Sequence, residues 1–348
     1  MKKRRLGCSG LVVSEVSLGA MSFGMGFTRD TNVDERLAAR LVHRALDAGV
    51  NLFDSAETYA QGRSEEVLGR ALRGRRDDVL LVTKVGFADL DPGALSYDNV
   101  VAACEASLHR LGVDHVDLYL LHRADRATPI EETLRALDDL MSRGLVGQIG
   151  VDNYRAWEIA GSVAHRRALQ RPAFSAVEVY LSLIGRQAEH EILPYARTED
   201  LGVLVHSPLA GGLLTSRNDT PGTRGRRRVG GLPEFDPTTR NRALAVLERI
   251  ACAHAVSMAQ IALAWVLARP GIATAIVGAR TVEQLDDNLA AADLELHAEE
   301  IAQLDAATAP DAMYPATVDR QWGFPEPPYT EGAAIPERLV RQDGTHSD

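Results

Sequence analysis

The chain has little that would suggest a secreted, membrane, metal-binding or nucleic-acid-binding protein. Its 348 residues hold three cysteines, Cys8, Cys104 and Cys252, whose spacing fits no metal site, so we expect reduced packing residues. No apolar run approaches the ~20 residues of a membrane helix, and the residues after the basic start are too polar for a secretory signal. The net charge of -10 argues against nucleic acid as the main partner. A cytoplasmic location is therefore expected.

Short β-branched or leucine-rich runs alternate along the chain with longer segments of helical period, which is typical of a parallel sheet covered by helices. Strands are predicted at residues 16–18, 51–53, 79–83, 116–121, 146–151, 176–179, 202–205 and 275–277. Helices are predicted at residues 34–48, 64–73, 97–111, 130–143, 155–166, 192–200, 240–255, 257–268 and 282–292. This order predicts an α/β fold, a single (β/α)8 TIM barrel.

Three segments fall outside the repeat. Residues 210–238 are too long and too rich in glycine and proline for a connecting loop, which indicates a functional lid. Residues 309–348 are proline-rich and then polar, so an extended, partly disordered C-terminal tail is expected after a barrel domain at residues 1–308. The opening, through about Val13, precedes the first barrel strand and is a candidate plug for the barrel floor.

Titratable side chains stand where three successive strands run out into their loops. Asp54, Lys84 and His122 end the apolar runs at residues 50–53, 79–83 and 116–121, and Tyr59 follows Asp54 in the same loop. The carboxyl ends of the strands are where a (β/α)8 barrel does its chemistry. These four candidate catalytic residues are therefore expected to share one pocket.

The four residue types suit proton transfer to a carbonyl oxygen. A phenol has a pKa near ~10 and exchanges protons poorly at neutral pH unless a cation stabilises the phenolate, which Lys84 can do. Asp54 would hold Lys84 charged, and His122 would donate a hydrogen bond to the substrate or share the proton work with Tyr59. From these residues alone, a buried ion pair, a core histidine and a surface phenol remain open alternatives.

Five segments resemble the aldo-keto reductase family in order and spacing, and the similarity runs from Arg5 to Ala292. They are RLGCSGLVVS at 5–14, FDSAETY at 53–59, LHRAD at 121–125, SPLAGG at 207–212 and GARTVEQL at 278–285. Together they are highly specific for the family, although the fold supports many substrates. The resemblance implies that hydride passes from nicotinamide C4 to a carbonyl carbon while Tyr59 protonates the oxygen.

The resemblance also implies a site for NADPH or NADP+. Gly19 and Met21 would approach the nicotinamide ribose, with residues 210–238 covering the cofactor. The implied pyrophosphate contacts are Ser207, Pro208, Leu209 and Gly211, whose backbone amides would bind the oxygens. The implied contacts to the adenosine 2′-phosphate and adenine are Gly278, Arg280, Gln284 and Asn288. A helix N-terminus and a guanidinium together suit a phosphomonoester, although a solvated arginine is the alternative for Arg280.

This chain departs from the family at positions that contact the nicotinamide. It has Asp152 before Asn153 where relatives have Ser-Asn, Glu178 where they have glutamine, and His206 where they stack tryptophan or tyrosine. Ionised carboxylates would favour the cationic oxidised ring over the neutral reduced ring. Burial could instead protonate an acid and silence this effect. Neutral drift in the cofactor grip is the third alternative.

These features predict reduction of an aldehyde or ketone by NADPH, with a small, sugar-derived or other biosynthetic carbonyl as the substrate. Two rival functions remain: a nucleotide-binding regulatory subunit similar to potassium-channel β subunits, and a non-redox or cofactor-recycling barrel enzyme. His122 beside the other three catalytic candidates favours an enzyme. The strand ends offer no clustered ligands for a metal. The oligomeric state is not readable from the sequence.

Overall fold

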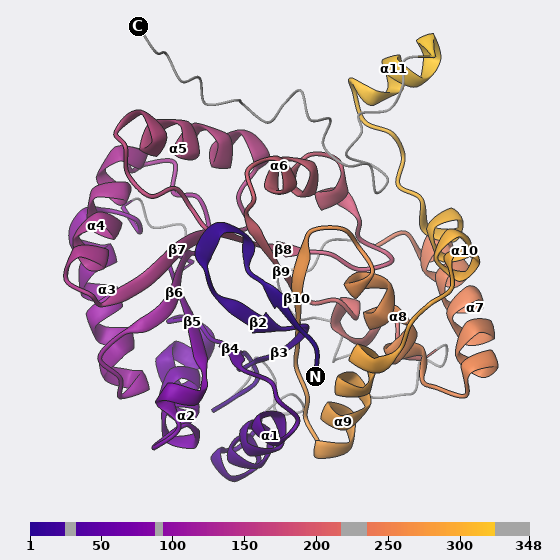
Figure 1. Cartoon of the computed structure of the whole chain (residues 1–348), viewed down its shortest axis with the longest axis horizontal. Coiled ribbons are helices and arrows are strands. Elements are labelled where there is room, and N and C mark those ends of the chain that lie inside the picture. The colour runs from indigo at the N-terminus through magenta and orange to yellow at the C-terminus, as the bar shows by residue number, and fades with distance from the viewer. Residues whose placement is uncertain (25–32, 88–92, 217–234, 324–348) are drawn as a thin grey trace, which may run out of the picture.

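The computed structural model describes residues 1–24, 33–87, 93–216 and 235–323. Parallel strands close into one barrel in the order β10-β3-β4-β5-β6-β7-β8-β9 (Figure 1). The strands are β3 Val16–Gly19, β4 Leu52–Asp54, β5 Leu80–Val85, β6 Val116–Leu121, β7 Val146–Asp152, β8 Ala176–Tyr180, β9 Gly202–His206 and β10 Ile272–Val277. Every predicted strand is present, so the (β/α)8 TIM barrel is confirmed.

The predicted helices are also present, and they surround the barrel in Figure 1. They are α1 Glu35–Asp47, α2 Arg63–Ala71, α3 Tyr97–Leu111, α4 Ile130–Ser142, α5 Ala156–Ala168, α6 Ile192–Thr198, α7 Pro237–His254, α8 Met258–Leu267 and α9 Val282–Ala290. Helix α7 begins three residues earlier than predicted because Asp236 caps it, accepting hydrogen bonds from the backbone of Thr238 and Thr239, with Pro237 in the first turn.

Two further helices follow the predicted ones. Helix α10, Ala298–Thr308, packs against α7, and the short α11, Ala316–Trp322, lies within the segment expected to be extended. Figure 1 shows α11 standing apart from the barrel wall. The remainder of that segment, residues 324–348, and most of the predicted lid, residues 217–234, lie outside the described residues.

No single helix among the described residues is long and apolar enough to cross a membrane. Helices α7 and α8 meet that criterion only when they are taken together, and the pair is bent by 100°. Helix α8 is buried along nearly its whole length, from Ala259 to Leu267.

A hairpin that the periodicity did not predict closes the barrel floor. Strands β1, Lys3–Arg5, and β2, Val12–Ser14, pair antiparallel and cross the barrel in Figure 1. Leu6 and Val13 of this segment are fully buried in the cluster that fills the barrel interior. The backbone N–H of Ser14 donates to Asn51 Oδ1 at 2.7 Å, which ties the hairpin to the entrance of β4. The hairpin therefore lies across the floor of the barrel.

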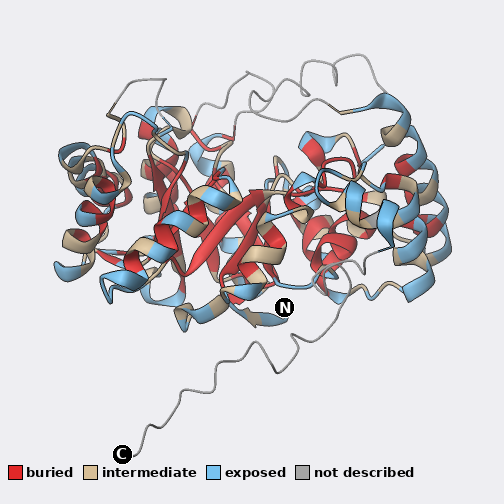
Figure 2. Cartoon of the chain, turned by 90° about the horizontal axis from the view of Figure 1, so that it is seen from above, coloured by how far each residue is buried: buried red, intermediate tan, exposed pale blue. Residues whose placement is uncertain are grey.

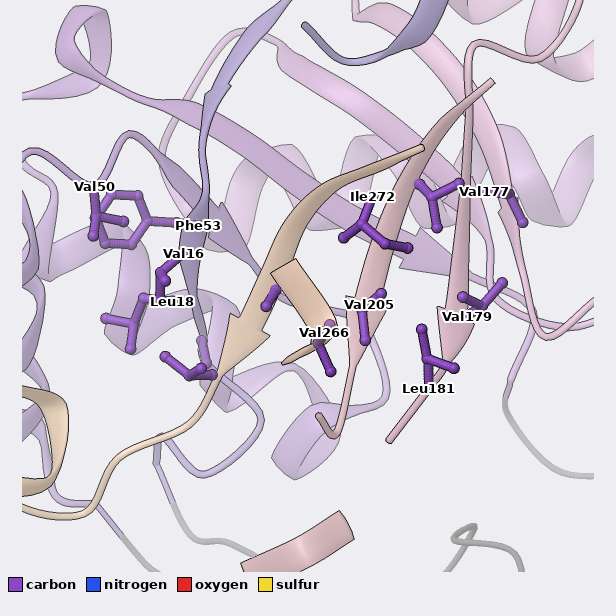
Figure 3. Packing of buried hydrophobic residues seen from close by; sticks show 14 of the residues in the cluster. Val16, Leu18, Val50, Phe53, Val177, Val179, Leu181, Val205, Val266 and Ile272 are labelled. Carbon is purple, nitrogen blue, oxygen red and sulfur yellow. The ribbon is translucent and has the colours of Figure 1, made fainter. Parts of the chain in front are cut away.

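Side chains alternate between two cores along each barrel strand. Outward-facing residues such as Val16, Leu18, Val177 and Val205 pack under the helices, as Figure 3 shows from close by. Inward-facing residues form the second cluster, which includes Leu52, Val82, Leu118, Leu120, Ala176 and Leu204. In Figure 2 the barrel strands are mostly buried, while most of the exposed residues lie on the surrounding helices and loops. The last inward position of each strand therefore faces the mouth of the barrel.

The first prediction concerns the floor. Leu6→Ala should lower the free energy of unfolding by about 2–5 kcal/mol, because Leu6 has no exposed surface and its loss leaves a cavity. Val12→Ala, in the same hairpin, serves as the control, since Val12 is 46% exposed and its truncation should cost less than about 1 kcal/mol. Urea unfolding of both variants measures the difference. Equal losses would mean that Leu6 is not a packing residue of the floor.

Candidate active site

Six consecutive strands, β4 to β9, bring titratable side chains to the barrel mouth. These side chains are Asp54, Lys84, His122, Asp152, Glu178 and His206. In five of the strands the titratable residue comes two positions after an apolar interior residue, as Lys84 follows Val82 and Glu178 follows Ala176. The two-residue repeat of a strand therefore places all of them on the same inner face.

Lys84 lies at the centre of this group and is fully buried. Its ammonium donates to the Asp54 carboxylate, lies 3.3 Å from Glu178 Oε1 and lies 3.4 Å from the hydroxyl oxygen of Tyr59. The Tyr59 and His122 rings meet edge to face, with centroids 5.8 Å apart. The structure thus brings together the four residues that the sequence predicted to be catalytic.

The loop after β4 holds Tyr59 against Lys84. Tyr59 begins a short 3-10 turn in which Ala60 and Gln61 both have positive φ, at 50° and 57°. The backbone N–H of Tyr59 donates to Ala56 O at 3.1 Å. Burial raises the pKa of the Tyr59 phenol, and the Lys84 charge opposes that rise. Tyr59 is therefore protonated at neutral pH and has a proton to give.

A buried carboxylate behind the barrel wall anchors the strand that carries Lys84. Thr83, which precedes Lys84 on β5, donates through Oγ1 to Glu65 Oε1 at 2.5 Å, and Arg110 Nε donates to Glu65 Oε2 at 2.6 Å. Glu65 has no exposed surface. Its helix was predicted, but nothing in its sequence pattern distinguished this glutamate from a surface one.

Asp152 and Glu178 lie side by side at the mouth, since their Cα atoms are register partners on β7 and β8. They are 2% and 1% exposed, and Asp152 Oδ1 and Glu178 Oε2 have no hydrogen-bond partner among the described residues. Burial raises the pKa of Asp152 to about 8 and the pKa of Glu178 well above its usual range. Of the alternatives drawn from the sequence, protonation by burial is the one that the geometry supports.

Both histidines of the mouth are neutral. Burial, and then the Lys84 charge, lowers the pKa of His206 to about 3 and lowers that of His122 well below its usual range. The side-chain amide of Asn153 donates to His122 O at 3.3 Å and so fixes the residue that follows β6. Within the described part of the chain, no group of three or more His, Cys, Asp or Glu side chains is arranged to hold a metal ion.

Two aromatic residues at the site were missed from the sequence. Phe87 packs on His122 with ring centroids 4.5 Å apart and is 45% exposed, and Tyr180 packs on His206 at 5.7 Å. Tyr180 comes two residues after Glu178, so the strand repeat could have revealed it. Phe87 follows β5 in a loop, where no repeat applies. Both rings therefore lie against histidines of the barrel mouth.

The residues present fit a nicotinamide at this mouth. A carboxamide could satisfy the unpartnered Asp152 Oδ1 and Glu178 Oε2, because it carries both donors and an acceptor. Gly19 lies beside Asp54 in the barrel register, and a Cβ there would meet Ile276 Cγ2 at 2.9 Å. Met21 is half-buried in the turn after β3.

The segment after β9 forms a sharp turn at the residues that the sequence predicted to contact the pyrophosphate. Ser207, Ala210 and Gly211 have positive φ angles of 51°, 50° and 64°, which turn the chain sharply around Pro208 and Leu209. His206 Nδ1 lies 3.3 Å from Ser207 Oγ, so this turn adjoins the predicted nicotinamide pocket. Positive-φ turns of this kind aim successive backbone N–H groups into one concavity.

The predicted adenosine-phosphate residues gather at the start of α9. Thr281 caps the helix by accepting from the backbone of Gln284 at 3.2 Å, and Gln284 Oε1 accepts from the backbone of Arg280 at 3.0 Å. Asn288 Nδ2 donates to Gly278 O at 3.3 Å. Gly278 is exposed, and a Cβ added there would meet no atom within 4 Å.

Comparison with known proteins agrees with this geometry. A model of the Aldo/keto reductase family matches residues 15–309. The chain is 36% identical to a probable voltage-gated potassium channel subunit beta of Oryza sativa subsp. japonica, over 84% of this chain and 92% of the rice protein. It is 35% identical to the uncharacterized oxidoreductase YrpG of Bacillus subtilis, over 87% and 95%. It is 31% identical to versiconal hemiacetal acetate reductase of Aspergillus parasiticus, over 90% and 99%.

The second prediction concerns pH and stability. Because the Asp152 pKa is raised to about 8, the folded chain holds a proton that the unfolded chain lacks, and stability falls as pH rises toward 8. The two histidines, with lowered pKa values, act oppositely only below about pH 6.5. Between pH 6.5 and 8 the free energy of unfolding of Asp152→Asn should therefore rise relative to that of the wild type, by up to about 2 kcal/mol. Urea unfolding measures it.

The exposed Asp311→Asn is the control and should follow the wild-type pH profile. If Asp152→Asn also kept the wild-type pH profile, Asp152 would be ionised in the folded protein, and the fall in stability with pH would have to come from another group.

Proposed function

Because this chain belongs to the aldo/keto reductase family, we propose that it is an NADPH-dependent oxidoreductase that reduces an aldehyde or ketone to an alcohol. The observation that carries the proposal is the buried contact of one ammonium, Lys84 Nζ, with both the Asp54 carboxylate and the Tyr59 hydroxyl. That contact couples a fixed cation to a phenol at the mouth of the barrel, where a proton donor to a carbonyl oxygen is needed.

Tyr59 acts as the general acid in the proposed reaction. When bound, NADPH supplies the hydride for the carbonyl carbon. Tyr59 gives its hydroxyl proton to the carbonyl oxygen, and Lys84 stabilises the phenolate that remains. Asp54 keeps Lys84 charged and in place, because the two buried side chains form an ion pair and either charge would be costly without the other. Neutral His122 can donate one hydrogen bond to the same oxygen and so orients the substrate.

Three parts of the chain are proposed to bind the cofactor. Asp152, Asn153, Glu178 and His206 surround the nicotinamide, and the turn after β9 binds the pyrophosphate through its backbone. Arg280 and the start of α9 bind the 2′-phosphate, since a guanidinium and a helix N-terminus both favour a doubly charged anion.

The substrate is proposed to be a small carbonyl compound, sugar-derived or from another biosynthetic route. It would enter past Phe87 and Tyr180, whose rings border the pocket beside His122 and His206. The likeness to a reductase of versiconal hemiacetal acetate supports a biosynthetic carbonyl. We place the reaction in the cytoplasm, with no nucleic acid and no membrane as partner.

A second candidate is a nucleotide-binding regulatory subunit, which the 36% identity to a probable potassium channel subunit beta favours. The same barrel mouth would then bind nucleotide without turnover. The complete group of Asp54, Tyr59, Lys84 and His122 favours the enzyme, because a binding module has no need of a proton donor. A cofactor-recycling enzyme would need turnover without net oxidation of nucleotide.

The third prediction tests the proton donor. Tyr59→Phe should lower kcat by about 10²–10⁴-fold and leave nucleotide affinity nearly unchanged, because only the phenol hydroxyl is lost. Stopped-flow turnover and nucleotide titration measure the two quantities. Tyr314→Phe is the matched control, since Tyr314 is 81% exposed and remote from the strand ends. A Tyr59→Phe enzyme with more than a tenth of wild-type kcat would exclude Tyr59 as the general acid.

The fourth prediction tests the nucleotide. Arg280→Ala should lower the affinity for NADPH by roughly 10–150-fold, the equivalent of about 1.5–3 kcal/mol for a charge-assisted contact. The affinity for NADH should change little. Fluorescence titration of both nucleotides against both proteins gives the four affinities, with NADH as the internal control. Equal affinity of the unmutated protein for NADPH and NADH would overturn the preference.

A further inference from the structure

The buried mouth of the barrel holds more negative groups than positive ones. Three carboxyl groups, Asp54, Asp152 and Glu178, surround one ammonium, Lys84, and none of the four is more than 3% exposed. If every carboxyl were ionised, the group would carry two uncompensated negative charges. Desolvation makes such a state costly, so the free protein must bind protons here.

The contacts show which carboxyls hold the protons. Asp54 accepts directly from Lys84, whose charge opposes the rise in the Asp54 pKa that burial causes, so Asp54 is the carboxyl best able to stay ionised. Glu178 shares Lys84 through Oε1 at 3.3 Å and leaves Oε2 unpartnered. Among the described residues, Asp152 has ion-pair contacts only with the two neutral histidines, His122 and His206.

The groups facing Asp152 come from β8, from β9 and from the residue that follows β6. They are His122 Nε2 at 3.7 Å, His206 Nε2 at 3.9 Å and the register partner Glu178. Since both imidazoles are neutral, neither compensates an Asp152 charge. Lys84 and Asp54 act on Asp152 only at longer range, and with opposite signs.

Protonation also restores the hydrogen-bonding character that the resemblance leads us to expect. A carboxylic acid is one donor and one acceptor, as is the hydroxyl of a serine, and it also presents the acceptor that a glutamine carbonyl offers. Asp152 and Glu178 can therefore bind a neutral nicotinamide ring as an ordinary site would, provided that they keep their protons.

We propose that Asp152 and Glu178 form a pair that holds an exchangeable proton beside the reduced nicotinamide and releases it when the ring becomes oxidised and cationic. The proposal rests on the proposed function. It makes the two departures from the family a single device, in which the acid pair loses one positive charge as the ring gains one, so that the summed charge of pair and ring stays constant. The raised pKa values of both acids agree with it, and as a close pair they titrate together.

The step balances for one turnover. The carbonyl carbon gains a hydride with its two electrons, and the C=O π pair moves to the oxygen, where an O–H bond forms as the Tyr59 O–H bond breaks. A bound nicotinamide that gave up this hydride from its C4–H bond would be left cationic, and the acid pair would lose one proton and become an anion beside it. Reduction of one carbonyl consumes one proton in all. Tyr59 gives that proton to the substrate, and the proton that the acid pair releases is enough to restore the Tyr59 phenol.

Linkage turns this into a measurable difference between the two nucleotides. If oxidised nucleotide favours the ionised pair, binding of NADP+ must release about one proton more than binding of NADPH. The affinity for NADP+ relative to NADPH then rises with pH, by about tenfold per pH unit, between the pair's pKa values in the two complexes. The 2′-phosphate and the adenosine are common to both nucleotides, so their protons cancel.

The test is calorimetric titration of the full-length protein with NADP+ and with NADPH, in buffers of different ionisation enthalpy near pH 7.5. Wild-type protein should release about one more proton with NADP+ than with NADPH. The variant Asp152→Asn with Glu178→Gln, which keeps shape and hydrogen bonding, should show no difference. Each single variant should retain part of the difference in proton release. If circular dichroism shows that the double variant does not fold, the two single variants test the assignment instead.

Equal proton release by the two nucleotides in the wild type overturns the inference and leaves the proposed function standing. A difference that survives in both singles and in the double variant also overturns it, because the proton then belongs to another group. Failure of the wild type to bind either nucleotide overturns the proposed function and the inference together.

Discussion

A fully buried ammonium, that of Lys84, sets the conditions for the rest of the site. An uncompensated charge at that depth would be costly, so the fold has to surround Lys84 with carboxyl groups and fix its strand in place. Asp54 supplies the direct partner, Glu178 a second one at 3.3 Å, and Glu65 holds β5 from behind through Thr83. In return, the cation lies against the Tyr59 hydroxyl, where it can stabilise a phenolate. Structure and proposed chemistry thus depend on the same contact.

Asp152 and Glu178 change the amount of negative charge that the barrel mouth can hold. With a neutral serine and glutamine at positions 152 and 178, the mouth would hold one anion and one cation. With Asp152 and Glu178 it holds two further groups whose charge depends on protonation. A nicotinamide that alternates between neutral and cationic forms is a partner for such groups, because the pocket and the ring can then change charge together.

Much of the fold was readable from the sequence because strand and helix have different periods. The interior residues that fill the barrel recur every second position, and the same repeat leads from Val82 to Lys84 and from Leu204 to His206. The hairpin of β1 and β2 was not readable as strands, because each spans only three residues around Gly7 and Gly10. Its burial in the barrel depends on Leu6 and Val13 meeting side chains from strands far along the chain.

The residues of the candidate catalytic group were predictable as residue types at strand ends, but their electrostatics were not. Whether Asp152 is ionised depends on its depth and on two histidines that burial keeps neutral, and a linear sequence records neither. The role of Glu65 was hidden for the same reason, since a glutamate in the first turn of a helix is ordinarily exposed.

The central claim is that Lys84 and its neighbours serve carbonyl reduction. The most direct measurement identifies the nucleotide that copurifies with the protein, reduces it if necessary, and follows its absorbance as aldehydes and ketones are added. The account predicts bound NADP(H) whose reduced form is oxidised only when a carbonyl compound is present, with the alcohol formed in equal amount. A tightly bound reduced nucleotide that no aldehyde or ketone oxidises would contradict it.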